Sequence, residues 1–295
     1  MKSGFVSFIG RPNAGKSTLL NNIIGRKVAI TSNKPQTTRN LIQGIYNDDD
    51  SQIIFVDTPG IHKPKHKLGK VLNKQAYFTI DDADVILYVV DACEKIGNGD
   101  RFVIEVLEKT DKPVILLLNK IDKLTHEEIL VKISEYKDLY NFSDIIPVCA
   151  LKNESIKYLL KVLKTYLKDN IKYFDDDTVT NVDLSFLISE YIREKVLNYT
   201  HEEVPHAITC ITNSIEKAEN NISISATIIV DRENLKKIII GKSGTMLKKI
   251  GTSARHDIEA LLGEKVYLDL FVKVVKDWRD KEKFLNEIGF KDFNE

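Results

Sequence analysis

The chain has 295 residues, enough for two domains that each bury a core of their own. It carries 43 acidic and 43 basic residues, so bulk charge neither indicates nor excludes a nucleic-acid partner. Three cysteines without metal-ligand spacing argue against a disulfide framework and fit a reducing cytosol. An apolar stretch directly after Met1 and Lys2 leaves no room for a signal peptide, and no apolar run approaches a membrane span. We therefore expect a cytoplasmic protein.

The first motif lies between a predicted strand, residues 5–9, and a predicted helix that continues to residue 24. Its residues are Gly10, Arg11, Pro12, Asn13, Ala14, Gly15, Lys16, Ser17 and Thr18. Glycines at both ends let successive backbone N–H groups point at phosphate oxygens, and the positive end of the following helix adds to the same site. The pattern favours a phosphate-binding loop over a plain glycine-rich turn. Lys16 would reach the β- and γ-phosphates, and the Ser17 hydroxyl would ligate Mg²⁺.

A polar segment without hydrophobic periodicity follows at residues 31–40 and predicts a mobile loop. A threonine from such a loop can complete the Mg²⁺ shell while the γ-phosphate is present and withdraw after hydrolysis. We favour Thr38 over Thr37 for this role.

The next motif is a turn directly after a predicted buried strand, residues 51–56. It consists of Asp57, Thr58, Pro59, Gly60 and Ile61. In a phosphate-loop enzyme the aspartate holds Mg²⁺ directly or through its water shell, and the glycine amide donates to the γ-phosphate. We therefore assign catalytic roles to Lys16, Thr38 and Gly60. The basic stretch 61–69 is predicted to be a second switch, either as a solvated loop or as an RNA or ribosome contact.

Catalysis lacks an obvious base in this sequence. Small signalling GTPases place Gln after the glycine to orient the attacking water, whereas this chain has Ile61, which cannot hydrogen-bond through its side chain. His62 follows, and we expect it to be exposed. Backbone groups and the metal must then support the reaction. Asn13 leaves two hypotheses open: it helps to hold K⁺ where an arginine finger would otherwise act, or it only supports the turn.

Two further loops indicate the base. Asn119, Lys120, Ile121 and Asp122 follow a predicted buried strand, residues 113–118. A carboxylate at Asp122 can accept from N1–H and the 2-amino group of guanine, donors that adenine lacks on that edge. Cys149 and Ala150 follow another predicted strand, where a small residue lets a backbone N–H approach guanine O6. Together the motifs predict binding of GTP and Mg²⁺ and hydrolysis of GTP to GDP and phosphate.

The first half of the chain alternates predicted strands and helices. This alternation indicates an α/β fold, a doubly wound and mostly parallel sheet with helices on both faces, and such a fold carries its ligand loops at the carboxyl ends of the strands. We place the GTP-binding domain at residues 1–170. The acidic, turn-prone segment 171–182 is interpreted as a linker, followed by a second domain at 183–278 and a C-terminal tail at 279–295.

The second domain has the order α-β-β-α-α-β, with a tight Gly-x-x-Gly turn between two helices. That order describes the KH RNA-binding module, an α+β domain, here of type II. The glycines allow close approach of a nucleic-acid backbone, and nearby lysines offer phosphate contacts. A plain helical-hairpin turn is the alternative. The predicted RNA-binding residues are an apolar floor of Ile238, Ile239 and Ile240 and the surrounding Gly241, Lys242, Ser243, Gly244, Lys248, Lys249 and Arg255.

Both motif sets, in this order, resemble the Era family of bacterial ribosome-assembly GTPases over nearly the full length. The resemblance implies GTP or GDP and Mg²⁺ as cofactors, the 3′ end of 16S rRNA and the 30S subunit as partners, and a role in small-subunit maturation. It also implies partial peripheral association with the inner face of the cell membrane. We expect a monomer. Cys149 departs from the family, which usually has Ser there, but the useful contact is a backbone amide and we expect little loss of GTP affinity.

The combination of the two domains suggests a nucleotide-gated RNA clamp. GTP and Mg²⁺ would order the loops around Thr38 and Gly60, the GTP form would hold precursor rRNA, and hydrolysis would release it. GTPases that act in tRNA modification share the Asn13 loop and the Thr-Thr-Arg switch, so they and a membrane-associated regulatory GTPase remain as alternatives. A purely structural RNA-binding protein is disfavoured because the nucleotide motifs are all in place.

Overall fold

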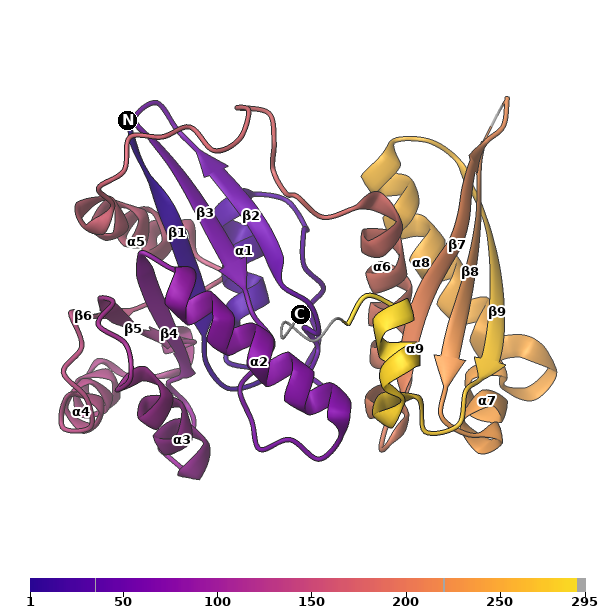
Figure 1. The fold of residues 1–295 in the computed structure, drawn as a ribbon, viewed down its shortest axis with the longest axis horizontal. Coiled ribbons are helices and arrows are strands. Elements are labelled where there is room, and N and C mark those ends of the chain that lie inside the picture. Colours follow the sequence, from indigo (N-terminus) through magenta and orange to yellow (C-terminus); the bar gives the residue numbers. More distant parts are fainter. Residues whose placement is uncertain (35, 220, 291–295) are drawn as a thin grey trace. The chain divides into compact units, whose positions relative to one another are not determined.

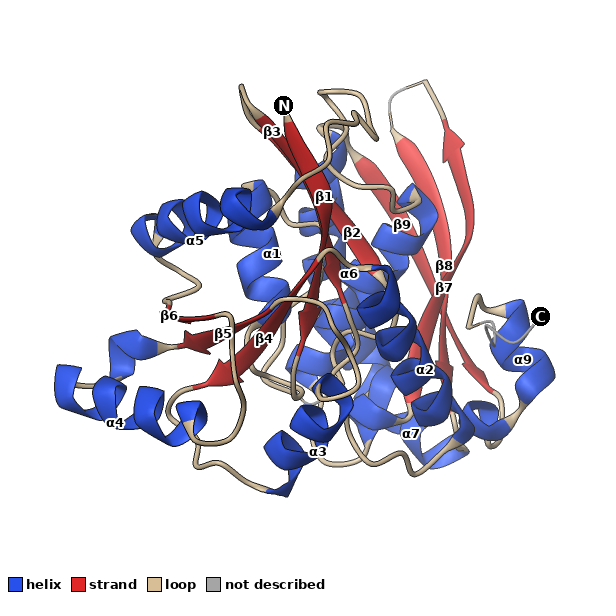
Figure 2. Ribbon diagram, turned by 60° about the vertical axis from the view of Figure 1, so that its left-hand side comes forward, coloured by secondary structure: helices blue, strands red, loops and turns tan. Residues whose placement is uncertain are grey.

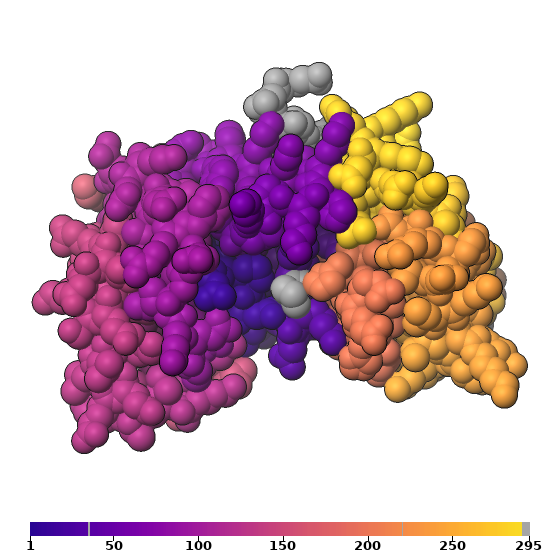
Figure 3. Space-filling model, turned by 90° about the horizontal axis from the view of Figure 1, so that it is seen from below, coloured from indigo at the N-terminus to yellow at the C-terminus, as the bar shows by residue number. Residues whose placement is uncertain are grey.

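The computed structural model describes residues 1–34, 36–219 and 221–290. Pro35 of the predicted mobile loop and residues 291–295 of the predicted tail therefore lie outside the described residues. The chain divides into two compact units, the first with residues 1–65 and 69–181 and the second with residues 66–68 and 182–290 of those described. Figure 3 shows surface atoms of both units, the second in orange and yellow.

The first unit is a six-stranded sheet in the order β2-β3-β1-β4-β5-β6 (Figure 1). β2 is antiparallel to β3, and the other neighbours are parallel. Its elements are β1 (Lys2–Ile9), α1 (Lys16–Ile24), β2 (Ile42–Asn47), β3 (Ser51–Asp57), α2 (Lys67–Asp82), β4 (Val85–Asp91), α3 (Asn98–Leu107), β5 (Val114–Asn119), the 3₁₀ turn η1 (Ile121–Lys123), α4 (His126–Lys137), β6 (Asp144–Pro147) and α5 (Asn153–Tyr166).

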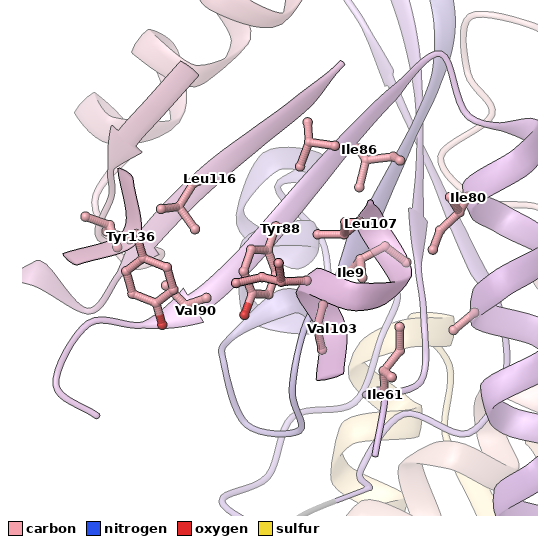
Figure 4. Close-up of a cluster of buried hydrophobic side chains, with 14 of the residues drawn as sticks. Ile9, Ile61, Ile80, Ile86, Tyr88, Val90, Val103, Leu107, Leu116 and Tyr136 are labelled. Carbon is pink, nitrogen blue, oxygen red and sulfur yellow. The ribbon is translucent and has the colours of Figure 1, made fainter. Parts of the chain in front are cut away.

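Continuous apolar runs form the central strands of this sheet because helices cover both of its faces. β4 has the sequence VILYVVD and is buried along nearly its whole length. On one face, side chains of β4 and β5 pack against α2 and α3, with Tyr88 and Leu116 near the centre (Figure 4). On the other, α1 contacts β2, β3 and α5 (Figure 2). The α/β class predicted from the sequence is confirmed.

The segment after α5 is paired with the first unit. Gln52 is buried in β3, where its Oε1 accepts from the backbone N–H of Tyr173 and Phe174 at 2.7 and 2.9 Å. Its Nε2 donates to the carbonyl of Phe174 at 2.9 Å. Farther along, Thr180 Oγ1 donates to the carbonyl of Gln43, and Val179 accepts from an amide of β2. The residues expected as a linker thus form specific contacts with β2 and β3.

The second unit is a three-stranded sheet in the order β7-β8-β9, with β7 antiparallel and β9 parallel to β8. α6 and α8 lie on one face (Figure 1), and in β8 Ile224, Ala226 and residues 228–230 are buried. Its elements are α6 (Leu184–Tyr199), η2 (Val204–His206), β7 (Ile208–Lys217), β8 (Ile222–Val230), α7 (Glu233–Ile240), η3 (Lys242–Gly244), α8 (Thr245–Leu262), β9 (Val266–Val274), η4 (Trp278–Asp280) and α9 (Glu282–Glu287).

The residues after β9 are anchored to this unit. Trp278 is fully buried, and its Nε1 donates to the carbonyl of Ala207 at 3.0 Å. Arg279 donates to Asp231 through Nε at 3.1 Å. The described part of the segment expected as a tail therefore includes η4 and α9. Among the residues 1–34, 36–219 and 221–290, no helix is both long and apolar enough to cross a membrane.

Candidate functional site

The loop between β1 and α1 needs its two glycines for different close approaches. Gly10 has φ +153°, and a Cβ there would lie 2.2 Å from the carbonyl oxygen of Val89. Gly15 has φ +100°, and a Cβ there would lie 2.2 Å from Asn119 Nδ2. Both distances are far below van der Waals contact, so a larger residue would displace the neighbouring strand or the asparagine. The loop therefore packs closely against Val89 of β4 and Asn119 of β5.

Lys16 is buried at the centre of this loop. Its Nζ donates to the carbonyls of Gly10 and Arg11 at 3.1 and 3.0 Å. Burial lowers the pKa of Lys16 to about 8, although the carboxylate of Asp57 opposes this shift. Two neutral carbonyl acceptors do not offset the cost of burying the Lys16 ammonium charge. An anion placed in the loop would therefore bind this ammonium strongly. Lys16 is thus suited to phosphate.

Three oxygen-bearing side chains from three elements converge beside Lys16. Ser17 Oγ donates to Asp57 Oδ2 at 2.6 Å, and Thr38 Oγ1 lies 2.8 Å from Ser17 Oγ and 3.2 Å from Asp57 Oδ2. Thr37 is directed elsewhere, since its hydroxyl donates to the carbonyl of Lys34. Thr38, the threonine favoured from the sequence, therefore lies with Ser17 and Asp57.

This oxygen set fits Mg²⁺. Asp57 is fully buried, and within the described residues its Oδ1 has no hydrogen-bond partner. Burial raises the pKa of Asp57, while the Lys16 ammonium and the two hydroxyls oppose the shift. A buried carboxylate oxygen without a donor is an acceptor that a cation can satisfy, and carboxylate and hydroxyl oxygens are ligands that Mg²⁺ prefers.

The turn after Asp57 is fitted closely to the phosphate loop. A Cβ on Gly60 would lie 2.5 Å from the backbone nitrogen of Pro12. Thr58 Oγ1 donates to the carbonyl of Phe8 at 2.6 Å, and Pro59 is buried beside it. Ile61 belongs to the hydrophobic core, and its N–H donates to the carbonyl of Gly10 at 3.2 Å. Thr58 and Ile61 thus hold the turn in place.

His62 and Asn13 connect the loops around the site. His62 is half-buried, which differs from the expected exposure, because its Nδ1 lies 2.9 Å from the carbonyl of Gly60 and its Nε2 lies 2.8 Å from Gln36 Nε2. Asn13 has φ +65°, and its Nδ2 donates to the carbonyl of Asn33 at 3.0 Å. The phosphate loop and both predicted switch segments are therefore joined by side-chain hydrogen bonds.

The predicted base-binding loops are joined by Asn119. Its Nδ2 donates to the carbonyl of Ala14 at 2.8 Å, and its Oδ1 accepts from the N–H of Ala150 at 3.0 Å. Asp122 is exposed at the end of the loop, and Cys149 Sγ donates to its Oδ1 at 3.2 Å. The thiol is the main cause that lowers the pKa of Asp122. The carboxylate therefore stays charged and available to two donors on a base.

In the second unit, the Gly-x-x-Gly turn is open to solvent. Gly241 and Gly244 have φ +72° and +79°, and Ser243 has φ +53°. Lys242 and Ser243 are exposed between them. Lys248 and Lys249 are also exposed, and they line a shallow hollow of about 400 Å³ on α8, where Lys249 Nζ lies 4.2 Å from the ring centroid of Tyr199. These cations are accessible to phosphates.

The predicted apolar floor is partly wrong. Ile238 is 45% exposed and Ile240 is half-buried, but Ile239 has no exposed surface and belongs to the core of this unit. Successive residues of a helix point about 100° apart, so three consecutive isoleucines cannot share one face. Arg255 is half-buried, and its Nε has no hydrogen-bond partner among the described residues. It is not among the residues that line the hollow with Lys248 and Lys249.

Comparisons with known proteins match regions of both units. Residues 5–120 match a family described as 50S ribosome-binding GTPase, and residues 203–279 match the KH domain. The chain is 42% identical to Era in a crystal structure of its complex with MgGDPNP and nucleotides 1506–1542 of 16S ribosomal RNA. That match covers 98% of this chain and 99% of the other, with a TM-score of 0.95. The chain belongs to the Era family.

A second Era structure supports the same assignment. It is that of a single-residue variant of Aquifex aeolicus Era bound to GDP·AlF₄⁻, which is also 42% identical, with 98% of this chain and 99% of that chain covered and a TM-score of 0.94. Membership of the Era family confirms the GTPase domain followed by a KH domain, and the assignment as a GTP hydrolase.

Sequence reasoning missed several contacts in this Era-family chain. Asp91 accepts from Lys120 Nζ at 2.6 Å, and the same ammonium donates to the carbonyl of Asn13 at 3.1 Å. The available signal was that Asp91 ends the apolar run of residues 85–90, because the carboxyl end of such a strand lies at the ligand edge of the sheet. The Cys149 thiol contact was also missed, since only a backbone contact was expected there.

Proposed function

We propose that this chain is a GTPase that binds the 3′ end of 16S rRNA and acts in maturation of the 30S ribosomal subunit. The observation that carries the proposal is its end-to-end similarity to an Era structure that holds both MgGDPNP and nucleotides 1506–1542 of 16S ribosomal RNA. The matched family description names the 50S subunit. We favour the 30S subunit because 16S rRNA is its RNA.

The nucleotide site would act through groups that already lie together. Lys16 would bind the β- and γ-phosphates, and Ser17, Thr38 and Asp57 would hold Mg²⁺, which supplies charge neutralisation at the phosphates. The Gly60 amide would donate to the γ-phosphate. Backbone N–H groups of the loop from Gly10 to Thr18 complete the cradle. The Asp122 carboxylate would select guanine, and Asn119 would brace the loops around the base.

K⁺ is a further candidate cofactor at Asn13. Its side chain already lies at hydrogen-bond distance from the carbonyl of Asn33, so rotation of the amide would bring two oxygens toward one cation. A cation there would neutralise charge that develops during hydrolysis where no arginine finger is assigned. The test compares GTP hydrolysis in K⁺ and Na⁺ at equal ionic strength. A several-fold preference for K⁺ that Asn13→Ala removes supports the site, and equal rates reject it.

RNA would be held by the second unit and released by hydrolysis. The open turn from Gly241 to Gly244 would accept an RNA backbone, with Lys242, Lys248 and Lys249 on phosphates and Ile238 beside the bases. GTP would favour the RNA-holding form, and by linkage RNA would favour GTP to the same extent.

The test measures affinity for the 3′-terminal segment of 16S rRNA with a GTP analogue, with GDP and without nucleotide, at fixed salt. Tight binding that is strongest with the GTP analogue supports both 16S rRNA as the partner and control of RNA binding by nucleotide. Binding that does not depend on nucleotide supports 16S rRNA as the partner and rejects control of RNA binding by nucleotide. Absence of binding rejects the ribosomal assignment and favours a tRNA-modification or membrane-associated regulatory GTPase.

We infer a cytoplasmic monomer with weak peripheral contact at the inner face of the cell membrane. An amphipathic basic surface can bind anionic lipid weakly and with strong salt dependence. Cosedimentation with anionic vesicles tests the contact. Binding at low salt that is lost at physiological salt supports it, and no binding at either salt rejects it. Sedimentation equilibrium tests the oligomeric state.

A further inference from the structure

Arg11 lies within the phosphate loop, but its side chain contacts α3 and the loop before it. Its Nη1 lies 3.0 Å from Asp100 Oδ2 and 3.1 Å from Glu94 Oε2. The Arg11 side chain is 35% exposed, whereas that of Asp100 is 3% exposed. A charge pair with one buried partner is screened less than a surface pair, so this contact has more energetic weight than an ordinary surface ion pair.

Asp100 is a fixed anchor for the guanidinium. Its Oδ2 also accepts from the backbone N–H of Gly97 at 2.9 Å, which caps the start of α3. Its Oδ1 accepts from the Tyr88 hydroxyl at 3.2 Å. Burial raises the pKa of Tyr88, so this hydroxyl keeps its proton. Tyr88 itself is fully buried in the core. The carboxylate is therefore held from two sides before Arg11 reaches it.

Gly99 makes room for the Arg11 side chain. A Cβ at this position would lie 2.9 Å from Arg11 Nε and 3.1 Å from Arg11 Cδ. Gly99 is not among the residues with positive φ, so its backbone conformation does not require glycine. A Cβ there would instead require the flexible end of the Arg11 side chain to shift away from its present position. The Arg11 side chain thus lies against Gly99 and forms ion pairs with Asp100 and Glu94.

The main chain of Arg11 also contacts Lys16 of the phosphate-binding site. The carbonyl of Arg11 accepts from Lys16 Nζ at 3.0 Å. The side chain of Arg11 is therefore anchored to α3 while its backbone contacts the lysine that would bind phosphate. A loop held in this way before the ligand arrives loses less conformational freedom on binding.

We propose that Arg11 is a positioning residue for GTP, and that its ion pair with Asp100 fixes the phosphate loop to α3 in the conformation that receives the phosphates. The guanidinium supports the loop from outside and does not contact the substrate. This role depends on the GTPase activity of the family and is independent of the RNA partner.

The experiment compares the kcat and KM of four variants of the full chain with the wild type. Arg11→Ala removes the anchor, and Gly99→Ala displaces the guanidinium while every charge remains. Arg11→Lys restores a cation of different shape. Arg101→Ala, an exposed arginine on the same helix, is the matched control. We expect KM to rise about tenfold for Arg11→Ala and about threefold for Arg11→Lys and for Gly99→Ala, with kcat within twofold of the wild type.

A double variant tests the pairing itself. If Arg11 acts through Asp100, then Arg11→Ala combined with Asp100→Asn raises KM no more than the more damaging single variant. Dissociation of a fluorescent GDP analogue follows the same ranking and does not depend on turnover. A fall in kcat of a hundredfold or more with unchanged KM would identify Arg11 as a group that contacts the transition state and overturn the proposal. A KM for Arg11→Ala equal to that of Arg101→Ala overturns it as well, whatever the thermal stability of the variant.

Discussion

The molecule contains two glycine-framed loops that each lead into a helix, and their surroundings differ. The loop from Gly10 to Gly15 is enclosed: Lys16 and Asp57 are buried, and Asn119 joins the loop to the end of β5. The turn from Gly241 to Gly244 is open, with Lys242 and Ser243 exposed. Each loop ends in a left-handed glycine that caps a helix, Gly15 or Gly244, but the two lie in different electrostatic environments.

The difference corresponds to the two kinds of ligand. Buried charges are weakly screened, so they bind a compact phosphate group strongly and act on charge that develops in a reaction. Exposed lysines act on the backbone of a nucleic acid through contacts that depend strongly on salt. The enclosed loop is therefore suited to chemistry on one ligand, and the open turn is suited to reversible binding of a chain.

Removal of the buried lysine is expected to have the largest effect. Lys16→Ala leaves a triphosphate without its main cation in a weakly screened site, so GTP affinity falls by about a hundredfold or more. RNA affinity measured without nucleotide stays within twofold. Isothermal titration calorimetry with a GTP analogue and with RNA checks both values. If a folded Lys16→Ala protein lost both affinities equally, the two loops would not be independent sites.

The reciprocal change at the open turn is expected to be smaller. Replacement of Lys242 and Ser243 by Asp adds negative charge beside the RNA backbone, so RNA affinity falls by about tenfold or more. The slope of log affinity against log salt becomes less steep by about one unit. GTP affinity is unchanged. Fluorescence anisotropy over a salt series measures both quantities, and an unchanged slope would place the phosphate contacts elsewhere.

A pH effect distinguishes the enclosed loop further. Because the pKa of Lys16 is lowered to about 8 without nucleotide, phosphate binding requires uptake of a proton above that pH. GTP affinity is expected to be level below about pH 7, to weaken about twofold from pH 7 to pH 8, and to weaken about fivefold from pH 8 to pH 9. Titration calorimetry in two buffers of different ionisation enthalpy detects the proton. Lys16→Met, as the control, shows no such step.

The same shift has a defined sign for stability. Between about pH 8 and the ordinary lysine pKa of 10.5, the unfolded chain binds more protons at Lys16 than the folded, nucleotide-free chain does. The free energy of unfolding contributed by Lys16 therefore rises with pH through this window. Urea unfolding of the wild type and Lys16→Met at several pH values isolates the contribution, and parallel curves would show that Lys16 is not desolvated.

The smallest effect is expected at Cys149. Cys149→Ser keeps a donor for Asp122, so GTP affinity stays within about twofold, whereas Cys149→Ala removes the donor and weakens binding about threefold. The ratio of GTP to ATP affinity, measured by competition, is the reading most sensitive to Asp122. Equal values for the serine and alanine variants would show that the backbone alone matters at this loop.

Residues of the site whose roles follow from a local sequence pattern could be predicted, whereas residues whose roles depend on tertiary packing could not. Lys16, Ser17, Asp57 and Asn119 could be assigned from sequence because each follows a predicted strand or glycine-rich turn at fixed spacing. Asp100 could not, because its role arises from where α3 packs and not from any local pattern. Ile239 could have been corrected, since helical periodicity alone separates it from Ile238.

The segment expected as a linker shows a similar limit. Its acidic, turn-prone composition predicts a solvated connection, and composition carries no information on pairing with a distant strand. In the structure, Gln52 binds its backbone with both ends of a buried amide. Together with the bonds of Val179 and Thr180 to β2, these contacts override the local preference of the segment, as tertiary contacts often do.

The contact of this segment with β2 also protects the sheet. β2 is the outermost strand on its side, and Val179 and Thr180 bond to its free edge. An uncovered edge strand is a template for pairing with another chain. A fragment that ended at residue 168 would lack these residues, and the Gln52 amide would lose three of its bonds. Such a fragment would keep the GTP motifs and yet be prone to self-association, so a soluble isolated first unit should extend to residue 181.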